Sequence, residues 1–308
     1  MQLSKNVELR SAKNQVDVLI IDNDFSEAQI SLYGGHVLSF APKSDNRERL
    51  WVSECAVLDG TKAIRGGVPI CWPWFGEHVT NGHPSVKRQA HGYVRTQQWQ
   101  VVECVDSDIG TVVTLKPEAA VNPGFDSLGE GEAEGEAEGE GNVDLQLTVS
   151  IGNVLAVELT TKNVGATPFE FGGALHSYFN IEDISQTQLY GLSGDYLDKA
   201  PSFIDKSSVG ASSGLQVTPE TYIFEKETDN IHLSVERRLS IRAANFSIDV
   251  ESQGHDSIVV WNPWIEKSAA MADMQDDGYQ SMLCVEAAIT QGVTLAPNEQ
   301  HTLTQIIR

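Results

Sequence analysis

Short segments in which apolar and polar residues alternate recur along the chain. Alternation with a period of two is the pattern of a β-strand that buries one face. No stretch sustains the i, i+3, i+4, i+7 spacing of an amphipathic helix. The sequence therefore predicts an all-β protein, and the clearest strands are expected within 99–105, 143–151, 154–164, 232–244 and 257–264.

The order of these segments indicates a single architecture. Strands do not alternate with long helices, which disfavours a parallel α/β fold. We expect one domain over 1–308, a large β-sandwich of two antiparallel sheets. Residues 128–141 read LGEGEAEGEAEGEG and hold six glutamates, so we expect them to form an exposed, flexible acidic insert in a hairpin-like connection.

Composition narrows the range of partners. The 308 residues include 43 acidic and 21 basic side chains, for a formal net charge of −22. This charge repels a phosphate backbone and an anionic membrane surface, so neither nucleic acid nor a membrane is an expected partner. With 41% hydrophobic and 21% charged residues, the composition is that of a soluble globular protein.

The N-terminus and the cysteines bear on the cellular compartment in which the protein is expected. The first fourteen residues, MQLSKNVELRSAKN, contain no apolar core of a signal peptide, and no run of eighteen apolar residues occurs anywhere, so a cytoplasmic location is expected. The four cysteines form no CxxC pair. This spacing favours reduced core thiols over a disulfide framework or a zinc site.

The segment AIRGGVPICWPWFG, at 63–76, combines features of a ligand-binding loop. Consecutive glycines let the backbone approach a ligand, and the tryptophan and phenylalanine rings offer faces on which sugars stack. Arg65 would donate to a phosphate or a carboxylate. A rigid turn with core tryptophans is the alternative interpretation.

The segment HGYVR, at 91–95, holds two further donors. If Tyr93 lies on a strand, His91 and Arg95 project from the same face. Such a pair fits an anionic or oxygen-rich ligand, because both side chains donate to oxygen. A structural histidine is the alternative.

Two titratable residues lie in apolar segments. His176, within FEFGGALHSYFN at 169–180, should have a perturbed pKa and little access to water, which suits a general acid. Glu286, within MLCVEAA at 282–288, is a candidate general base unless it points outward as a surface charge.

Taken together, these segments resemble the aldose 1-epimerase (mutarotase) superfamily, and within it the glucose-6-phosphate 1-epimerase branch. The resemblance implies a β-supersandwich fold with neither a metal nor an organic cofactor. It covers most of the chain and rests on an ordered set of segments, namely 34–40, 50–53, 65–76, 91–95, 174–180, 259–264 and 271–288.

The resemblance also implies residue roles. His176 matches the general acid and Glu286 the general base of the family. Arg65 and Arg95 match the arginines that hold the substrate phosphate, and His91 the histidine that contacts sugar oxygens.

Asp229 is our candidate for the aspartate that binds a sugar hydroxyl. The acidic insert has no counterpart in the family pattern, and Ala90 stands where some members carry a glutamine, which bears on one phosphate contact.

These residues suit anomer exchange. A base removes the proton of the C1 hydroxyl while an acid protonates the ring oxygen, and the two groups exchange roles as the ring recloses. We expect a monomer that acts on a hexose 6-phosphate, with glucose 6-phosphate as the expected substrate. The alternatives are a non-catalytic carbohydrate-binding or sugar-sensing module, an enzyme for free aldoses, and a glycoside hydrolase, which would need two carboxylates.

Overall fold

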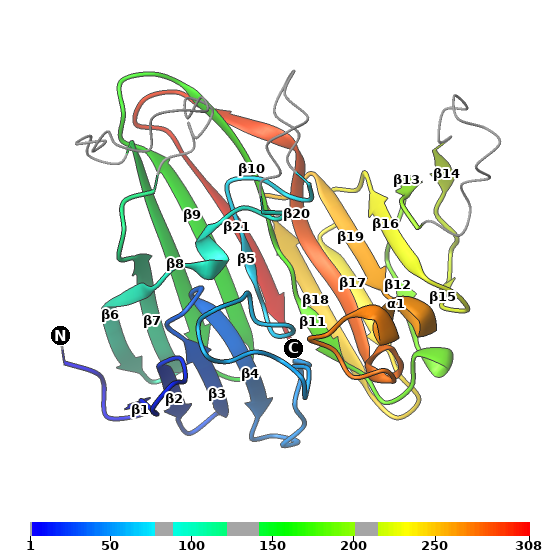
Figure 1. Ribbon diagram of the computed structural model, residues 1–308, viewed down its shortest axis with the longest axis horizontal. Coiled ribbons are helices and arrows are strands. Elements are labelled where there is room, and N and C mark those ends of the chain that lie inside the picture. Colours follow the sequence, from blue (N-terminus) through cyan, green and yellow to red (C-terminus); the bar gives the residue numbers. More distant parts are fainter. Residues whose placement is uncertain (1, 78–88, 122–141, 201–214) are drawn as a thin grey trace.

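The computed structural model describes residues 2–77, 89–121, 142–200 and 215–308, and these form three antiparallel sheets (Figure 1). The smallest sheet has the order β1-β2-β3-β4 and comprises β1 (Val7–Arg10), β2 (Val18–Asp22), β3 (Ser26–Ser31) and β4 (His36–Pro42). The predicted all-β class with large antiparallel sheets is confirmed, and this third sheet adds to the two that the sequence predicted.

The two large sheets hold the other strands. The nine-stranded sheet has the order β15-β12-β17-β18-β21-β9-β8-β7-β6. It comprises β6 (Trp99–Ser107), β7 (Gly110–Pro117), β8 (Val143–Ile151), β9 (Leu155–Asn163), β12 (Gln188–Tyr190), β15 (Tyr222–Ile223), β17 (Arg238–Arg242), β18 (Ser247–Gln253) and β21 (Gln300–Ile307).

The eight-stranded sheet has the order β14-β13-β16-β19-β20-β10-β5, and β11 also pairs with β20. It comprises β5 (Ile70–Cys71), β10 (Phe169–Leu175), β11 (Tyr178–Asn180), β13 (Asp195–Asp198), β14 (Gln216–Val217), β16 (Thr228–His232), β19 (Ser257–Asn262) and β20 (Met282–Leu295). Figure 1 shows β20 crossing the middle of the molecule next to β19.

Helical segments are short in the described ranges. They are the α-helix α1 (Trp264–Ala270) and the 3₁₀ helices η1 (Val94–Thr96), η3 (Ile184–Gln186) and η5 (Gly278–Gln280). None of these helices is long and apolar enough to cross a membrane.

Alternation along β8 builds the core as the sequence predicts. Leu145, Leu147 and Val149 are buried, while the residues between them are half-buried. Because side chains on a strand point to alternate faces, one face of β8 packs into the main hydrophobic core.

In the centre of the eight-stranded sheet, both strand faces are buried. On β20, Leu283, Val285 and Ala287 belong to the main core. The residues between them, including Cys284 and Glu286, lie on the opposite face. This second face carries the site described below.

Two predicted strands differ from the structure, and the apolar segment around His176 is not continuous. Residues 232–244 are not one strand, because β16 ends at His232 and β17 begins at Arg238. The segment 257–264 leaves the sheet after Asn262, whose Oδ1 accepts a hydrogen bond from the Trp264 amide. The segment 169–180 divides into β10 and β11, and His176 lies at the break.

The prediction that Tyr93 could lie on a strand is wrong. His91 and Gly92 have φ angles of 64° and 71°, and η1 begins directly afterwards. A Cβ on Gly92 would lie 1.9 Å from the carbonyl oxygen of Trp72, so glycine is required where the two segments touch. His91 and Arg95 therefore do not share a strand face.

The acidic insert at 128–141 lies outside the described residues, between β7 and β8, which are neighbours in the nine-stranded sheet. All four cysteines are free thiols. Cys71 and Cys284 are buried, Cys104 is half-buried and Cys55 is exposed.

Candidate active site

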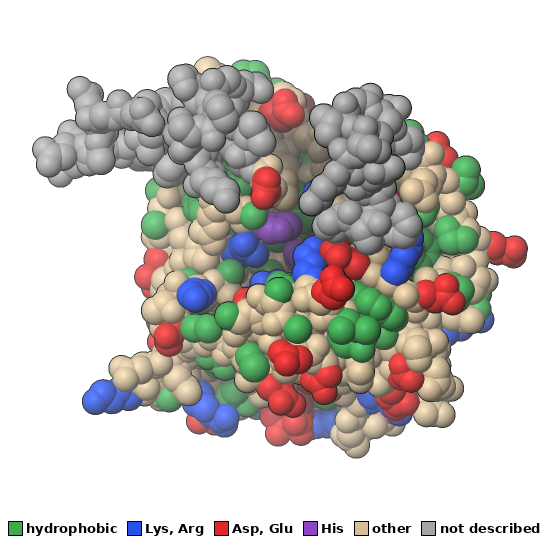
Figure 2. Space-filling model, turned by 45° about the vertical axis from the view of Figure 1, so that its right-hand side comes forward, with side chains coloured by type: hydrophobic (Ala, Val, Ile, Leu, Met, Phe, Trp, Pro, Cys, Tyr) green, Lys and Arg blue, Asp and Glu red, His purple; other side chains and the backbone are tan. Residues whose placement is uncertain are grey.

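A cavity of about 610 Å³ opens on the face of the eight-stranded sheet that points away from the main core. Figure 2 shows it as a hollow with histidine at the bottom and both acidic and basic side chains around the rim. Its lining includes five of the six predicted site residues, namely Arg65, His91, His176, Asp229 and Glu286.

Strand register builds the floor of this cavity. Glu286 on β20 pairs with Val259 on β19, which pairs in turn with Ile231 on β16. These three side chains therefore form one row across the sheet. Glu286 is 1% exposed, so its carboxyl group lies at the base of the cavity and is not a surface charge.

His176 stands beside Glu286 at the break between β10 and β11. Its backbone amide donates to the carbonyl of Pro69, and its ring stacks on Tyr178 with the centroids 4.9 Å apart and the planes 9° apart. Trp261 and His91 meet the ring edge-on at 6.2 and 5.5 Å. Aromatic packing thus determines the orientation of the imidazole.

The two titratable groups nearly touch. His176 Nδ1 lies 3.4 Å from Glu286 Oε1. Within the described part of the chain, neither His176 Nδ1 nor Glu286 Oε2 has a hydrogen-bond partner, although both atoms are sealed from solvent. Because His176 lines the cavity while its Nδ1 is sealed, its Nε2 is the nitrogen that faces the cavity.

Burial favours the uncharged form of both groups. It holds the pKa of His176 well below its usual value, and the positive charges of Arg95 and Arg65 act in the same direction. Burial and the neighbouring Asp229 raise the pKa of Glu286 well above its usual value, while Lys199 opposes the shift. The buried site therefore favours a neutral imidazole on His176 and a protonated carboxyl group on Glu286.

Arg65 reaches the cavity from the glycine turn that the sequence singled out. Its Nη2 lies 3.0 Å from Asp273 Oδ2, and its Nη1 donates to the Tyr178 hydroxyl at 3.0 Å. Gly66 and Gly67 follow with φ angles of 116° and 62°, a backbone path that disfavours side chains. Tyr178 thus contacts both the guanidinium and the imidazole of His176.

His91 presents a hydrogen-bond donor to the cavity. Its Nδ1 accepts a hydrogen bond from the amide of Gly76 at 3.3 Å, and Phe75 packs edge-on against its ring at 4.9 Å. Burial, helped by Arg95, Lys199 and Arg65, lowers the pKa of His91 to about 3. The ring is therefore neutral, and its proton is on Nε2.

Arg95 does not line the cavity. It belongs to η1, and its Nη2 donates to the carbonyl of Ala90 at 2.8 Å. Its Nε is buried without a hydrogen-bond partner among the described residues. Its charge still reaches the site, because it lowers the pKa values of His91 and His176.

Asp229 does line the cavity, next to Trp261 in the β16–β19 register. Burial raises the pKa of Asp229, and Lys199 and Lys267 oppose the rise. Lys267 Nζ lies 3.9 Å from Asp229 Oδ2 and 2.8 Å from Glu227 Oε1.

Sequence reasoning missed several residues that shape this site: Tyr178, Lys199, Trp261, Lys267 and Asp273. Tyr178 and Trp261 stood inside the quoted motifs, so their apolar surroundings were a signal. The lysines lie in segments without a motif. Lys199 directly follows β13, where its amide donates to the carbonyl of Asp229, and Lys267 lies on α1.

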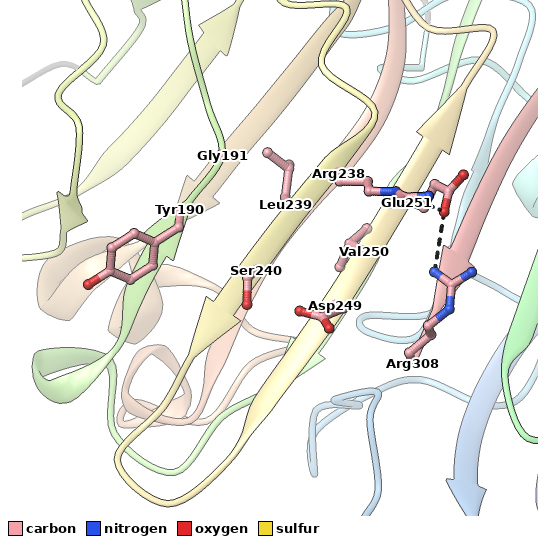
Figure 3. A pocket seen from close by; sticks show the side chains of 9 residues that line it. All are labelled: Tyr190, Gly191, Arg238, Leu239, Ser240, Asp249, Val250, Glu251 and Arg308. Atoms are coloured by element: carbon pink, nitrogen blue, oxygen red, sulfur yellow. Dashed lines mark hydrogen bonds and ion pairs between the residues drawn. The ribbon is translucent and has the colours of Figure 1, made fainter.

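A second hollow, of about 490 Å³, lies on the nine-stranded sheet (Figure 3). Arg238 and Arg308 both point to Glu251 there, at 3.5 and 3.4 Å. Its lining contains no histidine, and the carboxylate already engages both cations. Among its described lining residues, this second hollow therefore offers no histidine–carboxylate pair.

The layered antiparallel sheets, together with a buried histidine and glutamate at the floor of a cavity, define a galactose mutarotase-like protein. The chain belongs to the aldose 1-epimerase family, whose model matches residues 17–308. It is therefore an epimerase, an isomerase that interconverts sugar anomers.

Individual relatives agree with this class. A Salmonella typhimurium protein named "Putative glucose-6-phosphate 1-epimerase" is 31% identical over 293 residues, which cover 94% of this chain and 89% of the relative. A Cenchrus ciliaris protein of the same name is 33% identical over 286 residues, covering 89% and 78%.

Solved structures share the fold. A Salmonella typhimurium crystal structure described as a "putative mutarotase" superposes with a TM-score of 0.81 at 28% identity and covers 99% of this chain and 94% of that one. A galactose mutarotase-like protein from Lactobacillus casei has a TM-score of 0.63 at 16% identity, with coverage of 94% and 99%, and this likeness concerns the fold alone.

Proposed function

We propose that the protein interconverts the α and β anomers of a hexose 6-phosphate, and that glucose 6-phosphate is its substrate. The observation that carries the proposal is the contact between His176 Nδ1 and Glu286 Oε1 at the floor of the cavity, 3.4 Å apart with unpartnered buried atoms on both residues. The curated relatives' names point to the same substrate.

In this mechanism, Glu286 takes the proton of the C1 hydroxyl while protonated His176 gives the proton of Nε2 to the ring oxygen. The C1–ring oxygen bond breaks, and the open-chain aldehyde forms. Rotation about the bond between C1 and C2 presents the other face of the aldehyde, and the same groups return their protons as the ring closes.

The electrostatics of the site favour this direction of proton transfer. The ring-opening step turns a charged Glu286–His176 pair into a neutral one. Burial disfavours the charged form of both residues, so it makes Glu286 a stronger base and protonated His176 a stronger acid than in water.

The cavity also offers groups for the rest of the sugar. We propose that Nε2–H of His91 donates to a sugar oxygen and that Asp229 accepts a hydrogen bond from a hydroxyl. Arg65 is proposed to hold the phosphate, because it lines the cavity and Asp273 and Tyr178 keep its guanidinium in place. Arg95 contributes through its charge and not by direct contact.

The test is the rate of anomer exchange, measured by NMR magnetisation transfer with glucose 6-phosphate, galactose 6-phosphate and free glucose beside a buffer control. We expect acceleration with the phosphosugars. His176→Asn and Glu286→Gln should each slow exchange by a factor of about 10² to 10⁴ while substrate still binds. Normal exchange in either variant would remove that residue from the mechanism.

Substrate binding without accelerated exchange in the wild-type protein would favour a non-catalytic carbohydrate-binding or sensing module. Equal acceleration for glucose and glucose 6-phosphate would instead favour an enzyme for free aldoses. Arg65→Met separates a hexose 6-phosphate epimerase from an enzyme for free aldoses. In the first case it should raise KM for glucose 6-phosphate at least tenfold and change that for glucose little.

A further inference from the structure

Three side chains of metal-ligand type meet at the floor of the cavity. The ligand atoms of His176, Cys284 and Glu286 all lie within 4.8 Å of one another. All three residues are buried, and Cys284 and Glu286 are 0% and 1% exposed. A neutral imidazole, a thiolate and a carboxylate together form a donor set that suits zinc.

Strand pairing explains why these three side chains lie close together. Cys284 and Glu286 are two residues apart on β20 and therefore point to the same face. Cys284 pairs in register with Tyr178 on β11 and with Trp261 on β19. Both of these rings pack against His176, which holds the imidazole over this part of β20.

Two polar atoms of the cluster are buried without a hydrogen-bond partner among the described residues. His176 Nδ1 and Glu286 Oε2 are sealed from solvent, and neither has a hydrogen-bond partner in the described ranges. An unpartnered buried polar atom destabilises the fold, because it has lost its hydrogen bonds to water and gained none in the protein. A cation between the three side chains would give His176 Nδ1 a partner that the described residues do not provide.

We propose that this cluster binds a thiophilic divalent cation of the zinc type, and that the bound ion inhibits the enzyme by occupying its acid–base pair. The inhibition rests on the proposed function, whereas the binding does not. On binding, the Cys284 thiol releases its proton to solvent as the metal–sulfur bond forms, and any proton on Glu286 leaves as well.

The distances fit such an ion after a small adjustment. Tetrahedral zinc has bonds of about 2.0 Å to nitrogen and oxygen and about 2.3 Å to sulfur, so its ligand atoms lie roughly 3.3–3.6 Å apart. His176 Nδ1 and Glu286 Oε1, at 3.4 Å, already meet this spacing. The remaining atoms lie within 4.8 Å and need to approach by at most about 1.5 Å.

The surrounding charges permit a cation. Asp229 lies close enough to raise the pKa of Glu286, so it would also stabilise a positive ion at the same place. The guanidinium of Arg65 is already compensated by Asp273 at 3.0 Å. The positive charge of Lys199, in the cavity wall, repels the ion. A bound sugar phosphate would compete sterically with the ion.

Cobalt(II) tests the binding without reference to activity. Bound to a thiolate, it gives a sulfur-to-metal charge-transfer band in the near ultraviolet. We expect wild-type protein titrated with Co²⁺ to develop this band with one ion per chain, and one equivalent of Zn²⁺ to abolish it. Cys284→Ser and Cys284→Ala should both lose the band, and their melting temperatures show whether they fold.

Matched controls exclude other thiols. Cys71→Ser removes the other fully buried cysteine, and Cys55→Ser removes an exposed one. Both variants should keep the band. A band that is absent from wild-type protein, or that survives in folded Cys284→Ser, would overturn the proposal.

Inhibition is measured separately, as anomer exchange against free Zn²⁺. We expect the concentration for half-inhibition to rise at least tenfold in Cys284→Ser and to stay unchanged in Cys71→Ser. Equal zinc sensitivity in the wild type and Cys284→Ser would refute inhibition at this cluster. If wild-type protein accelerates no exchange, the proposed function fails while the cobalt band still decides the metal site.

Discussion

Acid should lower the stability of the fold by protonating one buried histidine, His36, which is hydrogen-bonded to the active-site loop. His36 begins β4, and its Nε2 donates to the carbonyl of Gly66, at 2.6 Å, directly after Arg65. The side chain is 1% exposed, and burial lowers its pKa from 6.5 to about 4, although the hydrogen bond to Gly66 opposes the shift. The neutral imidazole is therefore the form that fits the fold.

The sign of the pH effect follows from proton binding. Between pH 6.5 and 4, the unfolded chain binds a proton at His36 that the folded chain does not, so stability is present above pH 6.5 and falls as the pH approaches 4. At about 1.4 kcal/mol for each pH unit, the full loss is about 3 kcal/mol, of which about 2 kcal/mol is lost between pH 7.5 and 5.0.

The assay compares urea unfolding of wild-type protein and His36→Gln at pH 7.5 and 5.0. Glutamine keeps an amide donor for Gly66 but does not titrate. The other buried histidines titrate in both proteins and cancel in the difference. We expect the stability advantage of the wild type over the variant to shrink by about 2 kcal/mol at pH 5.0. An advantage that is equal at both pH values would refute this reasoning.

Three further predictions concern the site and the core. Gly92→Ala should destabilise the protein by about 2 kcal/mol or more, because its Cβ would meet Trp72 at 1.9 Å. Gly76→Ala has a similar φ of 73° and meets only the end of the Lys199 side chain, at 4.0 Å, so the difference between the two variants in thermal unfolding isolates the clash. Tyr178→Phe should raise KM for glucose 6-phosphate about tenfold in steady-state kinetics and leave that for glucose nearly unchanged, since only the bond to Arg65 is lost. Leu147→Ala, at a fully buried position, should cost about 2–5 kcal/mol in urea unfolding, and a cost below 1 kcal/mol would contradict its place in the core.

Local sequence patterns determined much of this protein. The alternation in 143–151 matches β8 residue for residue, because one face of that strand is buried and the other is half-buried. The apolar surroundings of His176 and Glu286 predicted their burial, and both residues are buried. These features depend on residues that are adjacent in the sequence, so the sequence pattern is sufficient to predict them.

The tertiary structure alone decided what meets across the sheet. Strand register places Glu286, Val259 and Ile231 in one row and Cys284 between Tyr178 and Trp261, because hydrogen bonding aligns residues that are distant in sequence. The turn at 91–92 likewise directs His91 into the cavity and leaves Arg95 outside it, since a close approach to Trp72 imposes positive φ angles. Alternation along a strand contains no information about either contact.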